Sequence, residues 1–442
     1  MKESHSHWLL ATNHNLGLLG RVVSNVGYIE ILRNNSPFRR LFAANMISFI
    51  GDWFTIISMF LIAGEASDDS PLAIAGVLAV RSRTHAPLEP LTGMLADRSS
   101  RKGLMVLANG GSFVILVGFL TFDLLGSLWS VYALTSVLVL ARVLFDPAEY
   151  AYLPNICNED ELLTANAMGS AGWSVSLGIG AGLGGLTISE LGVYEALWID
   201  TLTFLVSALI FASLPPGGPE KDKNRGGGIK MALREIGDGW IHIKDNAPIR
   251  RVVFAKAMWA AGGGAQVFLL ILIGMEAGFG SVAAGSIGIL YMARGFGSGT
   301  GPVIGRRLMR SDRLKPSLLG WSIFFAGVFY LAISAVDWSW VILLLVFISH
   351  GSSGINWVMS TTLLQERTDD EWRGRVAGTD YLLLTSMMGF SALGAGLILE
   401  GGHLTLRETI ALTAIIQIGM GAIWLIFATP NERLMLNQPI QG

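Results

Sequence analysis

The sequence predicts an all-α integral membrane protein: twelve transmembrane helices in two six-helix halves, with both termini cytoplasmic. Three observations predict it: an apolar composition, twelve long apolar windows, and an uneven distribution of basic residues between them. Hydrophobic residues make up 52% of the 442 residues and charged residues only 14%, against about a quarter in soluble domains. A chain this apolar has too few polar side chains to cover a soluble fold.

Each window is long enough to cross a bilayer, which takes roughly 20 helical residues because every backbone polar group must be satisfied within the segment. The longest polar stretch, 215–250, separates six windows from six and is predicted to link the two halves. The predicted spans are 42–64, 72–96, 103–123, 128–148, 163–187, 193–214, 251–275, 282–305, 316–336, 339–362, 376–399 and 408–428.

The basic residues predict the orientation, because short cytoplasmic loops carry an excess of Lys and Arg. Arg407 is the only Lys or Arg in the loops predicted to lie outside. The predicted organisation is a cytoplasmic N-terminal tail (1–41), a first half (42–214), a cytoplasmic linker (215–250), a second half (251–428) and a cytoplasmic C-terminal tail (429–442).

Within the linker, apolar residues recur at helical spacing from Ile229 to Ile243, which predicts an amphipathic helix. Two placements remain open for it. The helix could lie along the inner membrane surface, or it could pack on the cytoplasmic face of the protein itself.

Several classes of function are disfavoured. The net charge of -2 offers no basic field for nucleic acid, and the single cysteine, Cys157, excludes an internal disulfide and a multi-cysteine zinc site. The glycines at 180, 182 and 185 fit a dinucleotide-binding pattern, but they lie in a predicted span with no preceding strand. We find no phosphate-binding loop and no nucleophile–base or metal-ligand spacing, so we expect no cofactor, no metal and no enzyme activity.

The end of the second predicted span carries the most specific local pattern, GMLADRSSRK from Gly93 to Lys102. It resembles the loop motif of the major facilitator superfamily, although Ser100 replaces the usual glycine. The resemblance implies the major facilitator fold, in which the two six-helix halves are pseudo-repeats of each other. The resemblance implies a conformational latch, in which Asp97 accepts hydrogen bonds across the interface between the halves. A generic basic inner loop is the alternative. The implied latch residues are Gly93, Asp97, Arg98, Arg101 and Lys102.

The fifth predicted span has small residues at Ser176, Gly180, Gly184 and Gly185. This spacing resembles the glycine-rich motif of proton-coupled antiporters of the same superfamily, with Ala181 where the proline belongs. Close packing of helices explains the same residues without any role in antiport.

Four shorter segments resemble the enterobactin-exporter branch of that superfamily, and they occur in the same order. They are 35–41, 51–53, 153–154 with 162–167, and 373–376. This resemblance implies proton-driven export of a siderophore, a macrolide or another amphipathic compound.

Polar residues in the first predicted span fall on one helical face, as a cavity lining would. They are Asn45, Ser48, Asp52 and Thr55. An ionisable group inside the bilayer usually marks a pathway, a pair or a relay, so Asp52 is the leading proton-site candidate. The alternative is a fixed salt bridge to the charges of the second span.

The second predicted span is interrupted by Arg81, Arg83 and Glu89, and polar, broken helices often line substrate sites. The arginines are candidates to bind an anionic substrate group, and Glu89 is a second proton-site candidate; structural pairing explains them equally well. In the second half the candidates for the cavity are His350, Asn356 and Trp357, although a lone histidine is more often a packing residue.

We therefore expect a proton-coupled exporter of an amphipathic small molecule, working by alternating access as a monomer in the bacterial inner membrane. Its partners would be the substrate, protons and membrane lipid. Two alternatives remain: a transporter of lipid or lysolipid, and a membrane scaffold or assembly factor that transports nothing.

Overall fold

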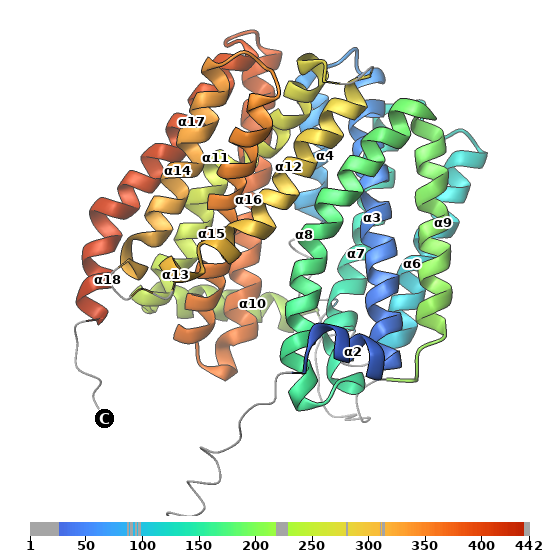
Figure 1. The fold of residues 1–442 in the computed structure, drawn as a ribbon, viewed down its shortest axis with the longest axis horizontal. Helices are drawn as coiled ribbons and strands as arrows, with labels where there is room; N and C mark the ends of the chain where they lie inside the picture. The colour runs from blue at the N-terminus through green and yellow to red at the C-terminus, as the bar shows by residue number, and fades with distance from the viewer. Residues whose placement is uncertain are drawn as a thin grey trace, which may run out of the picture.

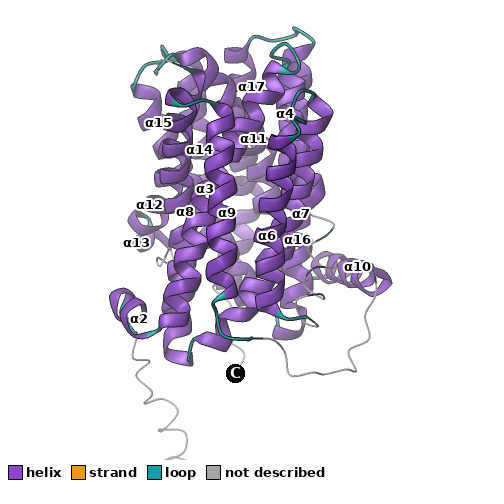
Figure 2. Ribbon diagram, turned by 90° about the vertical axis from the view of Figure 1, so that its right-hand side faces the viewer, coloured by secondary structure: helices purple, strands orange, loops and turns teal. Residues whose placement is uncertain are grey.

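The computed structural model describes residues 26–85, 88, 92, 95, 99–217, 229–279, 282–309, 311 and 314–436, and every secondary-structure element in these residues is a helix. Most of the helices run side by side along one axis (Figures 1 and 2). The first group comprises α2 (Tyr28–Asn34), α3 (Ser36–Glu65), α4 (Pro71–His85), α6 (Arg101–Thr121), α7 (Leu128–Ile156), α8 (Glu159–Glu190) and α9 (Val193–Ala212). The second comprises α10 (Ile229–Asp245), α11 (Ala247–Ala277), α12 (Ala283–Ile304), α13 (Arg306–Met309), α14 (Lys315–Ala335), α15 (Val341–Arg367), α16 (Asp370–Glu400), α17 (Leu406–Ile423), the π-helical η1 (Trp424–Ala428) and α18 (Thr429–Leu436).

Within the described residues, 10 helices are long and apolar enough to cross a membrane. The prediction of an all-helical membrane fold is confirmed at that level. The remaining two predicted spans correspond to α12 and to α4, whose described residues end at His85, within the predicted 72–96. Inside the bundle α4 packs against α16 and α7, and α12 packs against α8 and α15. The count of twelve spans and the cytoplasmic position of the termini stay predictions.

Helix ends are set by local capping signals. The Asn35 side chain accepts a hydrogen bond from the backbone N–H of Phe38 at the start of α3. Asn158 with Glu161, at the start of α8, satisfies two otherwise unpaired backbone donors reciprocally in a capping box. These caps lie beyond the apolar windows, so the helices extend past the bilayer-spanning segments that hydropathy alone identifies.

The two halves lie beside each other, with α3, α6, α7, α8 and α9 on one side and α11 and α14 to α18 on the other (Figure 1). We call the end of the bundle that carries α2, α10 and α18 the tail end, and the opposite end the far end (Figures 1 and 2). The main contacts between the halves are those of α8 with α12 and of α4 with α16, and α3 also touches α12 and α4 also touches α11.

Contact between the halves is close toward the far end and continues to the middle of α8, where a Cβ atom added at Gly295 of α12 would lie 2.4 Å from the backbone nitrogen of Gly178. A Cβ atom added at Gly185 of α8 would lie 2.5 Å from the backbone oxygen of Ala284 and 2.8 Å from Cα of Gly288 in α12, so these helices touch backbone to backbone. At the second helix pair, the Ser70 hydroxyl donates a 2.7 Å hydrogen bond to Glu400. The far end is therefore closed by direct contacts between the halves.

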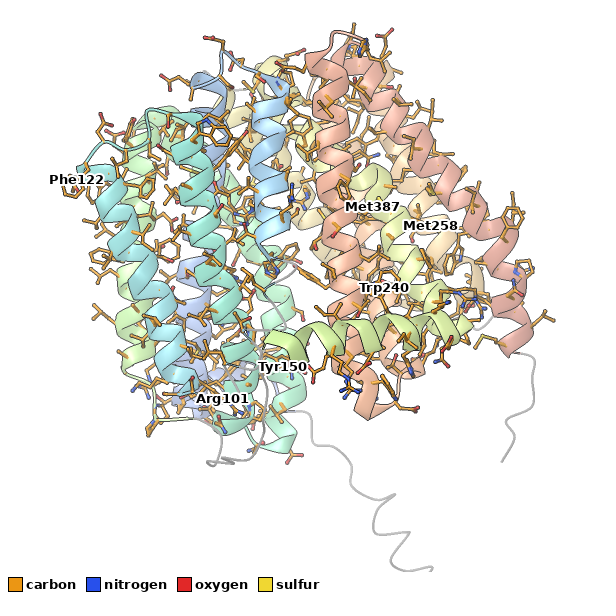
Figure 3. All side chains as sticks on the ribbon, turned by 180° about the vertical axis from the view of Figure 1, so that it is seen from behind. Arg101, Phe122, Tyr150, Trp240, Met258 and Met387 are labelled. Atoms are coloured by element: carbon orange, nitrogen blue, oxygen red, sulfur yellow. The ribbon has the colours of Figure 1, made fainter. Side chains whose placement is uncertain are left out.

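The linker helix α10 crosses the tail end at a steep angle to the bundle (Figures 2 and 3). It packs against α16 and α11, with Ile243 buried and the His242 ring stacked on Trp372 at 4.4 Å between centroids. Trp240, labelled in Figure 3, and Ile241 stay exposed. The helix therefore packs on the protein itself, and its position along the inner membrane surface stays a prediction.

A buried ion-pair cluster fastens α18 to the second half. The Glu432 carboxylate accepts from Arg251 Nε of α11 at 2.6 Å and from both terminal nitrogens of Arg367 of α15. Its side chain is only 5% exposed. Removing one partner would leave buried charges uncompensated. This cluster is therefore expected to contribute far more to stability than an exposed ion pair does.

Replacing Glu432 by Gln is expected to lower the melting temperature of the purified protein by about 5 °C, since breaking a buried pair costs roughly 3 to 5 kcal/mol. The matched control is Glu366→Gln, which removes a 3.2 Å ion pair with Lys315. The Glu366 side chain is 51% exposed. An exposed pair contributes about 0 to 1 kcal/mol. Equal melting temperatures for the two variants in the same detergent would contradict this account of α18.

Candidate functional site

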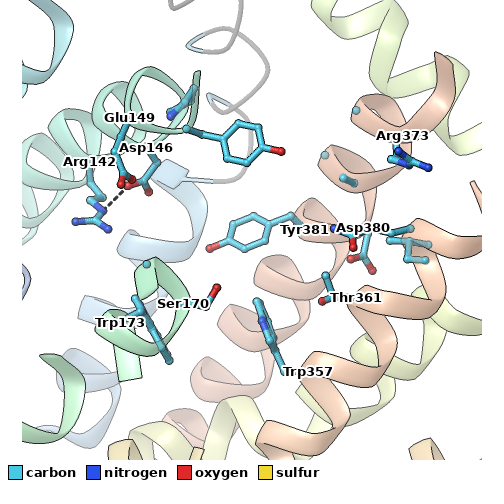
Figure 4. Close-up of a pocket in the computed structure, with 18 of the residues that line it drawn as sticks. Arg142, Asp146, Glu149, Ser170, Trp173, Trp357, Thr361, Arg373, Asp380 and Tyr381 are labelled. Atoms are coloured by element: carbon cyan, nitrogen blue, oxygen red, sulfur yellow. Dashed lines mark ion pairs between the residues drawn. The ribbon is translucent and has the colours of Figure 1, made fainter. Parts of the chain in front are cut away.

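A cavity of about 1010 Å³ lies between the halves at the tail end (Figure 4). Its lining comes from α3, α7 and α8 of the first half and from α11, α15 and α16 of the second, with part of α10. A deeper cavity of about 360 Å³ adjoins it and shares part of its lining, including Phe49, Arg142, Asp146, Trp173 and Tyr381. The two together form a path from the tail end into the middle of the bundle.

A charged chain crosses the first-half wall of this path. Arg142 of α7 pairs with Asp146 one turn along the same helix, at 2.8 Å, and with Asp52 of α3 at 3.5 Å. Asp146 in turn lies 3.9 Å from Nε2 of His85 on α4. The Arg142 guanidinium also stacks on the Phe49 ring at 3.9 Å. Asp52 thus lines the deep cavity, and its ion pair is with Arg142 of the fourth predicted span and not with a described charge of the second. Its role as a proton site stays a prediction.

All four residues predicted to share one face of the first span line one of the two cavities. Asn45 donates to Glu149 at 2.7 Å, Ser48 donates to Asn109 at 3.1 Å, and Thr55 donates to Asp200. Their helical spacing was enough to predict a common face, and packing of α3 against α8 and α9 turns that face toward the path.

Asp200 of α9 lines the deep cavity and was missed in the sequence analysis. Its oxygens accept from the hydroxyls of Thr55 and Thr203, and no basic side chain among the described residues pairs with it. A Cβ atom at Gly51 would lie 2.4 Å from Asp200 Oδ1, so the carboxylate sits against α3 beside Asp52. The signal was present, because Asp200 is an acid in the middle of an apolar span.

The two arginines of the second predicted span lie in different surroundings. Arg81 lines the deep cavity, whereas Arg83 is exposed and lines neither cavity. Residues two apart on a helix point in different directions, so a single face could not hold both. Glu89 lies outside the described residues.

Two of the three candidates of the second half do not line the path. His350 is buried, with Nε2 3.0 Å from the hydroxyl of Tyr330, and Asn356 donates to Ser322 at 3.1 Å. Both therefore bridge α15 to α14 within the second half. Trp357 does line the larger cavity, where the Lys256 ammonium lies 5.3 Å from its ring.

A buried ion pair that the sequence analysis did not select also lines the larger cavity. Lys256 of α11 and Asp380 of α16 are 2.5 Å apart and have side chains 7% and 4% exposed. Figure 4 shows Asp380 on the wall opposite Arg142, Asp146 and Glu149. Each half thus contributes a group of paired acidic and basic side chains to the wall of the path. Within the described residues, no three His, Cys, Asp or Glu side chains gather as a metal site.

Of the implied latch residues, Gly93, Asp97 and Arg98 lie outside the described residues. Arg101 donates to the backbone oxygen of Ala151 at 2.8 Å and to Asn155 at 3.0 Å, and Lys102 donates to the backbone oxygen of Leu214 at 2.7 Å. Both side chains therefore tie α6 to the tail-end ends of α7 and α9 within the first half, and Arg101 is labelled there in Figure 3.

The glycine motif of α8 packs against two helices. A Cβ atom at Gly180 would lie 2.9 Å from the backbone oxygen of Ile50, and Gly184 abuts the α3 backbone at Phe54. Gly185 faces α12 instead, and Ser176 lines the deep cavity with its hydroxyl 3.5 Å from the sulfur of Met46. The motif therefore holds α8 between its own half and the partner half.

Comparison with curated proteins finds partial matches. The uncharacterized MFS-type transporter YfiS of Bacillus subtilis strain 168 is 28% identical over 48% of this chain. A protein of the same strain, provisionally named the bacilysin exporter BacE, is 26% identical over 52% of it. The lysophospholipid transporter LplT of Photorhabdus laumondii is 25% identical over 42%. The matches cover 51%, 56% and 44% of these relatives, so the chain spans about half the length of the curated relatives it matches.

Solved structures match over nearly the whole chain. A peptide transporter POT variant in complex with alafosfalin superposes with a TM-score of 0.71 at 10% identity, covering 91% of this chain and 96% of that one. A bacterial homolog of the human lysosomal transporter Spinster gives 0.67 at 14% identity, covering 91% and 98%. At these identities the likeness shows the fold alone.

The profile of the Major Facilitator Superfamily matches residues 41–392, most of the chain. With the apolar helices described above, these relatives indicate a multi-pass protein of the bacterial inner membrane. The expected resemblance to this superfamily is confirmed, while the enterobactin-exporter branch stays a prediction. The chain belongs to the Major Facilitator Superfamily.

Proposed function

We propose that this protein is a secondary active transporter that exports an amphipathic small molecule in exchange for protons. The observation that carries the proposal is the path between the halves, which is closed at the far end and ends beside Asp52 and Asp200. Members of this fold work by rocking two halves about a central site, so that it opens to one side at a time.

In this proposal the tail end faces the cytoplasm, as the basic residues of the sequence predict. The observed arrangement is then the inward-facing state, ready to take substrate from the cytoplasm. To open outward, the contacts of α8 with α12 and of α4 with α16 must separate at the far end, while the tail end closes.

Proton coupling is assigned to Asp52, with Asp200 beside it. Two carboxylates in one small cavity repel each other when both are ionised, and one added proton removes that repulsion. A proton taken up by Asp52 from outside would also break the 3.5 Å pair with Arg142. Release of that proton to the cytoplasm would restore the pair and reset the site for the next substrate.

The lining suits a substrate with both polar and apolar parts. Aromatic rings of Trp53, Trp173, Tyr291 and Tyr381 line the deep cavity together with its acids and arginines. The partial match to a protein provisionally named a bacilysin exporter supports export as the direction. These observations do not identify a single compound as the substrate. The proposal of a siderophore or drug-like class rests on the sequence resemblance.

The test is uptake into everted membrane vesicles, in which export becomes accumulation. A hydroxamate siderophore and a cationic dye are supplied under an imposed pH gradient, with and without a protonophore. We expect accumulation of one of them above that in vesicles lacking the protein, and its loss with the protonophore. Accumulation that ignores the protonophore would refute proton coupling, and none at all would refute export of either class.

A second candidate function is movement of a lysophospholipid, which the partial match to LplT favours. The same vesicles carrying a fluorescent lysophosphatidylethanolamine separate the two functions. Transfer of this lipid between leaflets that depends on the protein and persists without a pH gradient would favour the second candidate over the first.

A further inference from the structure

Two of the arginines that line the deep cavity form no ion pair with its described acids. Its lining includes three aspartates (Asp52, Asp146 and Asp200) and three arginines (Arg81, Arg142 and Arg294). Arg142 takes both Asp52 and Asp146 as ion-pair partners, while Asp200 is held by two threonine hydroxyls. Arg81 and Arg294 are left without a carboxylate within ion-pair distance among the described residues.

Arg294 is the clearer of the two. It lies in the middle of the apolar helix α12, where its Nε is buried and has no hydrogen-bond partner in the described part of the chain. Its guanidinium lies 5.3 Å from the ring of Tyr291, one turn earlier on the same helix. A stacked ring compensates part of a cation's lost hydration, but it leaves the guanidinium donors unused.

Arg81 approaches the same cavity from α4 of the other half. Arg81, Tyr291 and Arg294 all line this one cavity. The ion pair of Asp52 is with Arg142, and Asp52 forms none with Arg81 among the described residues. The two free guanidiniums thus face one cavity from opposite halves of the protein.

Holding two such cations inside a membrane domain is unfavourable unless something binds them. The planar guanidinium fork matches the oxygens of a carboxylate or a phosphate, and bonds to a charged acceptor are stronger than neutral ones. The 360 Å³ of the cavity leaves room for such a group, and the Trp53 ring, 5.4 Å from that of Tyr291, adds an apolar wall.

We propose that Arg81 and Arg294 form an anion clamp that binds the oxyanion of an amphipathic substrate, with its apolar part against Trp53 and Tyr291. The inference rests on the proposed transport function and adds the chemical class of the substrate, an apolar body with one carboxylate or phosphate. Because the two arginines belong to different halves, a bound anion links the halves at the site about which they rock.

The first test uses inorganic sulfate on the purified full chain in detergent. Millimolar sulfate should raise the melting temperature above that in chloride of equal ionic strength. Each of Arg81→Gln and Arg294→Gln should weaken the apparent sulfate affinity by about tenfold or more, the effect of losing one charge-assisted contact. The matched control is Arg83→Gln, which removes an exposed arginine of α4 and should leave the sulfate response unchanged.

The control also removes general salt effects, which act on all variants alike. A sulfate response in the wild type that persists in both cavity variants would overturn the clamp, as would the absence of a specific response. Because the sulfate assay uses no pH gradient, a negative result in it can be distinguished from a failure of transport. Sulfate binding with no vesicle uptake of the siderophore or the dye would refute export of those two classes and leave the anion site.

A second arm identifies the body that carries the anion. Dansyl-leucine, compared with its neutral amide, represents a small carboxylate, and lysophosphatidylglycerol, compared with neutral monoacylglycerol, represents a lipid phosphate. If only one of the two charged compounds displaces sulfate, and the displacement is lost in Arg294→Gln, the clamp binds that type of compound. Displacement by neither charged member would overturn the assignment of an amphipathic substrate.

Discussion

Vesicles containing Asp52→Asn are expected to lose uptake driven by a pH gradient, while the protein remains folded in the membrane. Asparagine keeps the shape and the hydrogen-bonding capacity of the side chain but cannot bind and release a proton. The fold should tolerate the change, because Arg142 keeps its 2.8 Å pair with Asp146. The expected effect is loss of coupling rather than loss of structure.

The measurement pairs two assays on the same vesicles: gradient-driven accumulation, and exchange of labelled for unlabelled substrate with no gradient. Asp52→Asn should abolish accumulation and retain exchange. Asp123→Asn is the control, because Asp123 lies in the turn after α6, away from both cavities. Wild-type accumulation in Asp52→Asn would sink the proton-site assignment, and loss of exchange as well would indicate a structural role.

Gly185→Val is expected to stop transport by preventing closure of the far end. The added Cβ would lie 2.5 Å from the backbone oxygen of Ala284, and backbone cannot move aside as a flexible side chain can. The helices α8 and α12 must therefore separate there. The equilibrium between the two facing states should shift toward the one open at the far end.

A single cysteine reports this shift. Trp173 is exposed and lines both cavities, so Trp173→Cys in a Cys157→Ser background marks the path. Everted vesicles expose the predicted cytoplasmic side, and a membrane-impermeant maleimide should label the cysteine there, less so after Gly185→Val. Gly118→Val is the control, because a Cβ at Gly118 meets nothing within 4 Å. Equal labelling in both valine variants would contradict the closing role of Gly185.

The spans and the cavity face could be predicted because their signals are local. Apolar length located the helices, although α7 runs from Leu128 to Ile156, past the predicted end at 148, with Pro147 and Pro154 inside it. The spacing of Asn45, Ser48, Asp52 and Thr55 identified a common face because it depends only on helix geometry. The same test for intramembrane acids, applied to every span, would have found Asp200.

Pairing could not be predicted in this way. Arg142 and Asp52 are 90 residues apart in sequence, and Lys256 and Asp380 are 124 apart. Whether such groups meet depends on how each helix is rotated about its axis. That rotation turns His350 toward Tyr330, within the second half, and separates Arg81 in the cavity from exposed Arg83.

The sequence by itself therefore determined what each segment is: a membrane helix, a polar face, or a charge that must be accommodated in an apolar setting. Those properties follow from hydration and from helix periodicity within one segment. Only the tertiary structure decided which charges neutralise one another and which two arginines remain for a ligand. The reason is that close contacts between small residues, such as Gly185 and Gly288, fix the depth and rotation at which helices meet.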